Sequence, residues 1–299
     1  MKKVLVTGSS GQVGSWLDCL YGSPGETEHK LLTPNSNELD LAADDAELTT
    51  ALEQIQPDAI INCAAYTQVD KAEEEADLAQ RINATAPACI AAYCAAGSIP
   101  FIHVSTDFVF AGDKSSPYLP DDPTHPLSVY GQSKLDGEQL VRAANPSAYI
   151  VRTSWVYSEQ GDNFVNKIIG LAERHDELSV VDDQTGTPCY AKDLAAVLWA
   201  LLDTLPEQHL LHFANEGAVT RHAFAVAILE EAMHAGLLEK SPALSACSSD
   251  KFPAPARRPA YSALDSAATG RILELSGRPW REALHEMIAG KASESLKEV

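Results

Sequence analysis

Short aliphatic and β-branched runs alternate with longer segments in which apolar residues recur every three or four positions through the first half of the chain. A short apolar run is typical of a buried strand, and the wider spacing is typical of an amphipathic helix. The predicted strands are Lys3–Thr7, a second near Lys30–Thr33, Ala59–Asn62, Phe101–Ser105 and Tyr149–Thr153.

Helical spacing fills the intervals at Asp44–Ile55, Ala76–Ala96 and Tyr130–Ala144. Alternation of strands and helices builds a parallel sheet with helices on both faces. We therefore predict an α/β fold with a doubly wound parallel sheet.

The pattern becomes less regular after Trp155. Helical segments are expected at 164–174 and 192–202, with a short apolar run at 178–181. We expect residues 1–153 to form the sheet domain and residues 154–299 to form a smaller, interleaved lobe, with parts of 178–214 completing the sheet.

Composition limits the function classes. The chain has 299 residues, of which 45% are hydrophobic and 21% charged, which is too apolar for a disordered protein. A mean hydropathy of −0.13 is too low for a membrane protein. The 22 Lys and Arg against 42 Asp and Glu give a net charge of −20, which repels phosphate backbones. We expect no nucleic-acid and no membrane partner.

The first residues contain no signal-like apolar run, and the 6 cysteines form no C-x-x-C pair or zinc-like cluster. We expect a cytoplasmic protein without a metal.

A glycine-rich turn follows the first strand. Gly8, Gly11 and Gly14 stand between that strand and a helix, which is the order that a dinucleotide-binding turn requires. Gly8 permits the tight turn, Gly11 lets a diphosphate approach the backbone, and Gly14 allows close helix packing. The pattern predicts a Rossmann domain that binds NADPH or NADH, with Gln12 and Val13 beside the cofactor.

The preference between the two cofactors stays open. The segment 34–37 after the second strand has no acid to bind a ribose 2′-hydroxyl and no arginine to bind a 2′-phosphate. The missing acid favours NADPH. Asp40, next to Leu41, is a candidate for the adenine amino group, although a solvated loop acid explains Asp40 equally well.

Tyr130 and Lys134 share one helix face, because residues four apart are neighbours on a helix. A nearby ammonium stabilises a phenolate and lowers its pKa, so Lys134 would make Tyr130 a better proton donor. A surface Tyr–Lys pair would give the same spacing. Thr106, at the carboxyl end of the fourth predicted strand, strengthens the catalytic interpretation because its hydroxyl can reach the same carbonyl.

With these motifs the chain resembles the extended short-chain dehydrogenase/reductases, and among them the branch that makes dTDP-L-rhamnose. The resemblance extends over nearly the whole chain. It rests on the segments 11–14, 62–73, 83–84, 105–110, 130–134, 152–157, 163–164, 183–186 and 256–259.

The resemblance implies that Thr106, Tyr130 and Lys134 form the catalytic set. It also implies which residues contact the two ligands. The sugar would be lined by Asp107, Phe108 and Trp155, and the cofactor by Ala64, Ala65, Tyr66 and Asn83. The implied reaction is NAD(P)H-dependent reduction of the C4 keto group of dTDP-4-dehydro-L-rhamnose to dTDP-L-rhamnose. Arg257 and Arg258 are concentrated positive charge on an acidic chain, suited to the nucleotide diphosphate.

Two other functions remain open. A nucleotide-sugar epimerase or 4,6-dehydratase would share the fold, although Phe108 stands where a dehydratase carries its second carboxylate. A cofactor-bound regulatory subunit, similar to that of eukaryotic methionine adenosyltransferase, would also share it. An intact set of Thr106, Tyr130 and Lys134 argues against a purely structural role.

Some members of the family join two subunits through a magnesium ion held by acidic residues. The corresponding stretches here, 14–17 and 190–193, do not reproduce that carboxylate cluster. We therefore expect no metal, and either a monomer or a homodimer through another surface.

Overall fold

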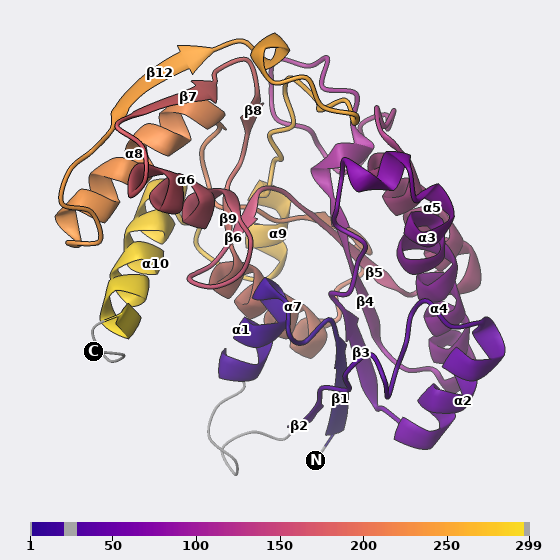
Figure 1. The fold of residues 1–299 in the computed structure, drawn as a ribbon. Helices are drawn as coiled ribbons and strands as arrows, with labels where there is room; N and C mark the ends of the chain where they lie inside the picture. Colours follow the sequence, from indigo (N-terminus) through magenta and orange to yellow (C-terminus); the bar gives the residue numbers. More distant parts are fainter. Residues whose placement is uncertain (1, 21–28, 296–299) are drawn as a thin grey trace.

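A central sheet of six parallel strands organises the molecule in the computed structural model, which describes residues 2–20 and 29–295 (Figure 1). Its strand order is β10-β5-β4-β3-β1-β2. The strands are β1 (Lys2–Thr7), β2 (His29–Leu32), β3 (Ala59–Asn62), β4 (Phe101–Thr106), β5 (Tyr149–Thr153) and β10 (Leu210–His212). The order reverses direction between β1 and β3, which is where doubly wound sheets open a ligand crevice. The predicted fold class is confirmed.

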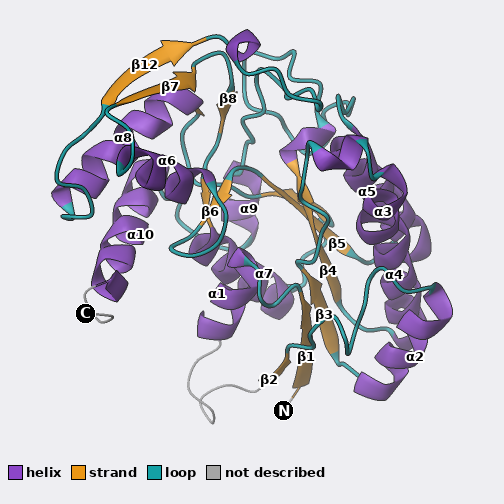
Figure 2. Ribbon diagram, viewed as in Figure 1, coloured by secondary structure: helices purple, strands orange, loops and turns teal. Residues whose placement is uncertain are grey.

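Helices cover both faces of this sheet (Figure 2). On one face lie α2 (Asp45–Ile55), α3 (Ala76–Gln80), α4 (Ala86–Gly97) and α5 (Val129–Ala144), and on the other α1 (Gln12–Leu20) and α7 (Ala191–Thr204). Side chains of β1 point alternately to the two faces of the sheet. Leu5 packs in the core beneath α2, α4 and α5, whereas Val4 and Val6 pack in the core beneath α1 and α7. This alternation follows from the two-residue period of a strand.

The segment predicted as one helix over 76–96 is divided in the structure. A π-helical turn, Arg81–Thr85, lies between α3 and α4. Within that turn Asn83 is fully buried, and its side chain bonds to the chain after β3. A regular apolar spacing could not show this, because the wider turn is set by a tertiary contact.

The second half of the chain forms a lobe and also returns to the sheet. The lobe contains α6 (Phe164–Ala172), α8 (Arg221–His234) and α10 (Trp280–Ser295). Three small sheets accompany them: β6 (Val156–Tyr157) with β9 (Cys189–Tyr190), β7 (Glu177–Val181) with β12 (Ala243–Cys247), and β8 (Thr185–Gly186) with β11 (Val219–Thr220). Between these elements α7, β10 and α9 (Ala267–Ile272) pack with the sheet domain. None of the described helices is long and apolar enough to cross a membrane.

A buried ion pair joins α5 to β5. The guanidinium of Arg152 donates to both carboxylate oxygens of Glu138, at 2.8 and 2.7 Å, and both side chains are only 4% exposed. Glu138 also accepts a hydrogen bond from the hydroxyl of Ser105 on β4, at 2.6 Å. The pair therefore fixes the helix that carries Tyr130 and Lys134 against two central strands.

Replacing Glu138 with alanine should lower the free energy of unfolding by about 3–5 kcal/mol, because the guanidinium of Arg152 stays buried without its countercharge. Urea denaturation measures this loss. The matched control is Glu230→Ala, which breaks the pair with Arg281 where both side chains are about half exposed. That change should cost less than about 1 kcal/mol. Equal losses in the two variants would contradict the role given to Glu138.

Candidate active site

The glycine turn lies against the loop that follows β3. Gly8 has a φ of +69°, which favours glycine, and a Cβ there would stand 2.7 Å from the backbone nitrogen of Ala64. A Cβ on Gly14 would stand 2.3 Å from the carbonyl oxygen of Gly8. The first turn of α1 therefore sits directly on the turn, with its backbone N–H groups at the β1–β3 crevice. This cradle suits an anionic diphosphate, so the residues present fit a dinucleotide.

Gln12 has a second contact that the motif did not reveal. Its side-chain oxygen accepts hydrogen bonds from the hydroxyl of Ser158, at 3.1 Å, and from the amide of Asn163, at 2.9 Å. Val13 is partly buried beside it. The glycine turn is thus tied to the lobe as well as to the sheet.

Asn83 holds the loop that contains Ala64, Ala65 and Tyr66. Its side-chain oxygen accepts from the backbone N–H of Tyr66 at 2.8 Å, and its amide donates to the Tyr66 carbonyl at 3.1 Å. The same amide donates to the hydroxyl of Ser133 on α5 at 3.0 Å. The predicted cofactor residues after β3 therefore lie beside the helix that carries Tyr130.

Asp40 and Leu41 differ from each other in environment. Asp40 is exposed, and its carboxylate accepts from the backbone N–H of Ala42 at 2.8 Å. Leu41 is buried in the core under α2. The structure shows Asp40 closing its own loop, and its predicted contact with adenine stays a prediction.

Thr106, Tyr130 and Lys134 come together between β4 and α5. The hydroxyl of Ser128 caps α5 by accepting from the backbone N–H of Gly131 at 3.2 Å, so the helix begins just before Tyr130. Tyr130 is 9% exposed and Lys134 only 2% exposed. Thr106 ends β4 with its hydroxyl next to the phenol of Tyr130.

The pKa of Tyr130 differs from the sequence-based expectation. Burial raises the pKa of the phenol to about 12, the hydrogen bond with Thr106 lowers it in part, and the charge of Asp107 raises it. Lys134 is not among these causes. Its Nζ donates to the carbonyl oxygen of Val104 at 2.7 Å, so the ammonium is engaged with the β4 backbone instead.

A buried hydrogen-bond chain leads away from Lys134. Its Nζ lies 3.4 Å from Nε2 of His103, and Nδ1 of His103 lies 2.9 Å from the amide of Asn62. The hydroxyl of Thr7 donates to the oxygen of Asn62 at 2.5 Å. Burial lowers the pKa of Lys134 to about 8, while the charges of Glu138 and Cys63 raise it. The chain links the ends of β1 and β3 to the lysine.

Asp107 and Phe108 follow Thr106 in a short 3-10 turn, Asp107–Val109. Asp107 is 2% exposed: Oδ1 accepts from the hydroxyl of Thr106 at 3.1 Å, and Oδ2 has no hydrogen-bond partner among the described residues. Burial raises the pKa of Asp107 to about 6, against hydrogen bonds from Ser262 and Thr106 and the charge of Arg221. The Phe108 ring meets the Tyr130 ring edge-on, with centroids 5.5 Å apart.

Trp155 has a φ of +46°, a left-handed conformation that is unusual for a bulky side chain. Its indole lies against the backbone of Gly186, where a Cβ would come within 2.5 Å of the ring. The Trp155 ring also contacts Arg221, whose guanidinium carbon lies 3.5 Å from the ring centroid. Sequence analysis missed Arg221, because nothing in its local pattern at the start of α8 marks it.

The two neighbouring arginines separate in the structure. Arg258 donates to the carboxylate of Asp70 at 2.7 Å, whereas Arg257 is exposed. Asp70 belongs to the loop after β3, so Arg258 joins the C-terminal segment to the cofactor side of the site.

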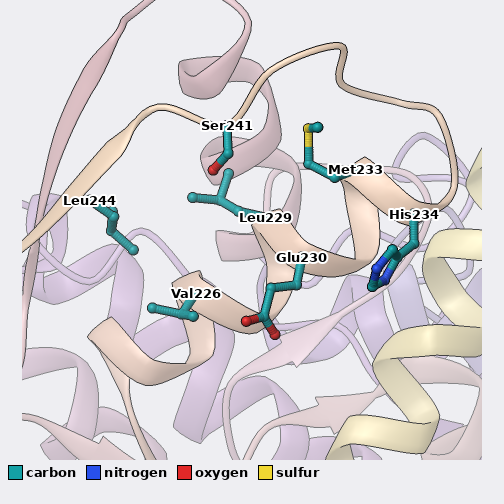
Figure 3. Close-up of a pocket in the computed structure, with 7 residues that line it drawn as sticks. All are labelled: Val226, Leu229, Glu230, Met233, His234, Ser241 and Leu244. Atoms are coloured by element: carbon teal, nitrogen blue, oxygen red, sulfur yellow. The ribbon is translucent and has the colours of Figure 1, made fainter.

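Other features lie outside this cluster. In residues 2–20 and 29–295, no group of three or more His, Cys, Asp or Glu side chains is placed to hold a metal ion. A pocket between α8 and the 241–244 segment is lined by none of the predicted site residues (Figure 3).

Comparisons with known proteins agree with the fold and the motifs. The family model described as RmlD substrate binding domain matches residues 1–293. A dTDP-4-dehydrorhamnose reductase of Mycobacterium tuberculosis is 42% identical over 303 residues, which cover 98% of this chain and 94% of the relative. A reductase of the same name from Mycolicibacterium smegmatis is 40% identical over 290 residues, 96% of this chain and 85% of the relative.

Two crystal structures are similar over almost the full length. A dTDP-4-dehydrorhamnose reductase of Clostridium acetobutylicum has a TM-score of 0.88 at 34% identity and covers 99% of this chain and 100% of its own. That of Bacillus anthracis, in complex with NADP, has a TM-score of 0.88 at 33% identity, with 97% and 99% covered. The resemblance drawn from the motifs is thereby confirmed: this chain belongs to the RmlD substrate binding domain family.

Proposed function

We propose that this chain reduces the C4 keto group of dTDP-4-dehydro-L-rhamnose with NADPH or NADH. The observation that carries the proposal is the buried cluster of Thr106, Tyr130 and Lys134 beside a glycine turn that fits a dinucleotide. The names of the relatives and the NADP in the Bacillus anthracis structure support the same reaction, and favour NADPH.

The cofactor residues each have a part in holding the dinucleotide. Gly8, Gly11 and the first turn of α1 would receive the diphosphate, and the loop at Ala64 and Ala65, fixed by Asn83, would flank it. Lys134 would bind the nicotinamide ribose. A reduced nicotinamide held there supplies the hydride.

Tyr130 donates the proton to the carbonyl oxygen as that oxygen gains charge. The hydroxyl of Thr106, which donates to Asp107 in the structure, would turn to donate to the same carbonyl oxygen and polarise it. The unshifted tyrosine is already protonated at neutral pH, and burial keeps it so. The phenol therefore enters the reaction as an acid, and the charge of Lys134 is needed only as the phenolate forms.

The remaining site residues shape the sugar pocket. Asp107, with its unpartnered oxygen, is suited to accept from a sugar hydroxyl, while Phe108 and Trp155 offer apolar walls. Phe108 packs on Tyr130, so the position that would need a second carboxylate for elimination of water holds an aromatic ring. This packing favours reduction over dehydration.

Replacing Tyr130 with phenylalanine should lower kcat by about 10²–10⁴-fold, because the general acid is removed while the ring and its packing remain. Absorbance of the reduced nicotinamide, with the 4-dehydro sugar nucleotide as substrate, measures turnover. Fluorescence titration should show nearly unchanged NADPH affinity. The matched control is Tyr149→Phe, a buried tyrosine of β5 that bonds to the carbonyl of Pro206. Loss of NADPH binding in Tyr130→Phe would refute the assignment.

The carboxyl of Asp107 gives the protein a pH-dependent stability. Its pKa of about 6 in the folded chain lies above the ordinary 3.8, so the folded state holds the proton more tightly than the unfolded state. The resulting stabilisation is full below pH 3.8 and is lost as the pH rises through about 6.

Asp107→Asn should therefore gain stability relative to the parent as the pH rises from about 4.5 to 7.5, by about 2 kcal/mol at 1.36 kcal/mol per pKa unit. Urea denaturation of both proteins across this range measures the difference. A difference that stays constant, or that shrinks toward high pH, would show that Asp107 is not a buried acid with a raised pKa.

A further inference from the structure

Arg221, the first residue of α8, stands in the candidate site with an unusual set of contacts. Its guanidinium carbon lies 3.5 Å from the ring centroid of Trp155 and 5.0 Å from that of Phe164. The side chain is only partly exposed. Stacking on aromatic faces orients a guanidinium and leaves the N–H groups at its edge free to bind a planar or tetrahedral anion.

Among the described residues the guanidinium of Arg221 makes no side-chain hydrogen bond and no ion pair. Its nitrogens are not among the fully buried polar atoms that lack a partner, so they keep contact with solvent. The arginines of the structural pairs behave differently: Arg152 forms a two-pronged pair with Glu138, and Arg278 bonds to Asp193 and Glu286. A guanidinium that is held over an aromatic ring and has no protein acceptor is available to bind an anion at the site.

One short strand brings Arg221 and the segment of Arg258 together. The backbone N–H of Arg221 donates to the carbonyl of Gln184, directly before β8, at 3.0 Å. On the other side of the strand, the N–H of Thr185 donates to the carbonyl of Ala260, and the N–H of Ser262 donates to the carbonyl of Thr185, both at 2.8 Å. The backbone of Arg221 and the segment that follows Arg258 are thus held at the start of the same short strand.

The electrostatics of the cluster agree with this placement. Burial lowers the pKa of Arg221 to about 9; the carboxylate of Asp107 raises it, and the positive charge of Arg258 lowers it. The charges of Arg258 and Asp107 therefore both act on Arg221, and Arg258 is itself paired with Asp70. With Asp70, two guanidinium groups meet two carboxylates here, whereas the whole chain carries a net charge of −20.

We infer that Arg221 and Arg258 together hold the diphosphate of the sugar nucleotide, with Arg221 binding the phosphate next to the sugar. This inference rests on the proposed function, since it names how that substrate is held. Arg221 is assigned the sugar-proximal phosphate because it lies against Trp155 and near Asp107, on the sugar side of the site. Arg258 lies farther along, bonded to Asp70. Arg257, which is exposed, is not needed for this contact.

The test compares two nucleotides that differ by that phosphate. Isothermal titration calorimetry measures the Kd of dTDP and of dTMP for the full chain saturated with NADP⁺. Arg221→Met keeps an apolar side chain against Trp155 and removes the charge and the N–H donors. We expect dTDP to bind roughly 10- to 100-fold more weakly, because a charge-assisted contact is lost. Affinity for dTMP should change less than about threefold.

Two further variants make the result specific. Arg221→Lys keeps the charge without the planar fork and should weaken dTDP binding by an intermediate amount. It also serves if Arg221→Met fails to fold, which thermal unfolding reveals. The control is Arg271→Met, an exposed arginine of α9 outside the site, which should bind dTDP as the parent does.

The outcomes separate this inference from the proposed function. If the parent binds dTDP and reduces the 4-dehydro sugar, but both Arg221 variants bind dTDP as tightly as the parent, the inference is wrong and the proposed function stands. Equal losses for dTDP and dTMP also overturn it, because Arg221 would then act on the nucleoside or on pocket shape. A parent that neither binds dTDP nor reduces the sugar overturns both.

Discussion

Contact between the backbone of α5 and two helical turns, Arg81–Thr85 and Asp107–Val109, determines where the catalytic side chains stand. A Cβ on Gly137 would come 2.1 Å from the carbonyl oxygen of Asn83, and one on Gly131 would come 2.3 Å from that of Phe108. Ordinary contacts begin near 3.4 Å, so any larger residue at either position pushes the helix outward by about an ångström. Displacements of that size cost orders of magnitude in rate. The absence of two side chains thus positions Tyr130 and Lys134.

Buried charged side chains occur in two kinds of environment in this protein. Arg152 and Glu138 satisfy each other completely and secure the helix, as buried pairs must. Asp107 keeps one buried carboxylate oxygen without a partner, and the guanidinium of Arg221 lies over the Trp155 ring near it. A buried polar group without a partner lowers the stability of the folded protein, and the same group can then form a favourable contact with a ligand. Such groups are common in binding sites and rare in the supporting scaffold. Glu138 also acts on the site, because its charge raises the pKa of Lys134 against burial.

Local patterns predicted most of the fold. The strands and helices that were given bounds within residues 1–153 were predicted to within about a residue, apart from the division of 76–96, because apolar period and glycine position are local properties. The sixth strand, β10, was not predicted as a strand. The pairing of Tyr130 with Lys134 was also predictable, since residues four apart share a helix face. The pKa of Tyr130 was not, because burial depends on what the rest of the chain packs around it.

The missed parts of the site join residues far apart in the sequence. Arg221 reaches Trp155 through the pairing of β11, which directly precedes α8, with β8. Asn83 reaches Ser133 through the packing of α5. Arg257 and Arg258 looked equivalent as a pair, but neighbours in an irregular segment can point in opposite directions, and only Arg258 turns toward Asp70. Sequence identified the types of chemistry present and could not identify these partners.

The π-helical turn at Arg81–Thr85 has a consequence for how this segment can vary. Such a turn accommodates one residue more than an α-helix does. Removing a single residue would merge α3 and α4 into one uninterrupted helix and rotate Asn83 by about 100° relative to one of them. Its amide would then leave the backbone of Tyr66. The junction of these helices is therefore fixed in length, because a deletion would break the contact between Asn83 and the backbone of Tyr66.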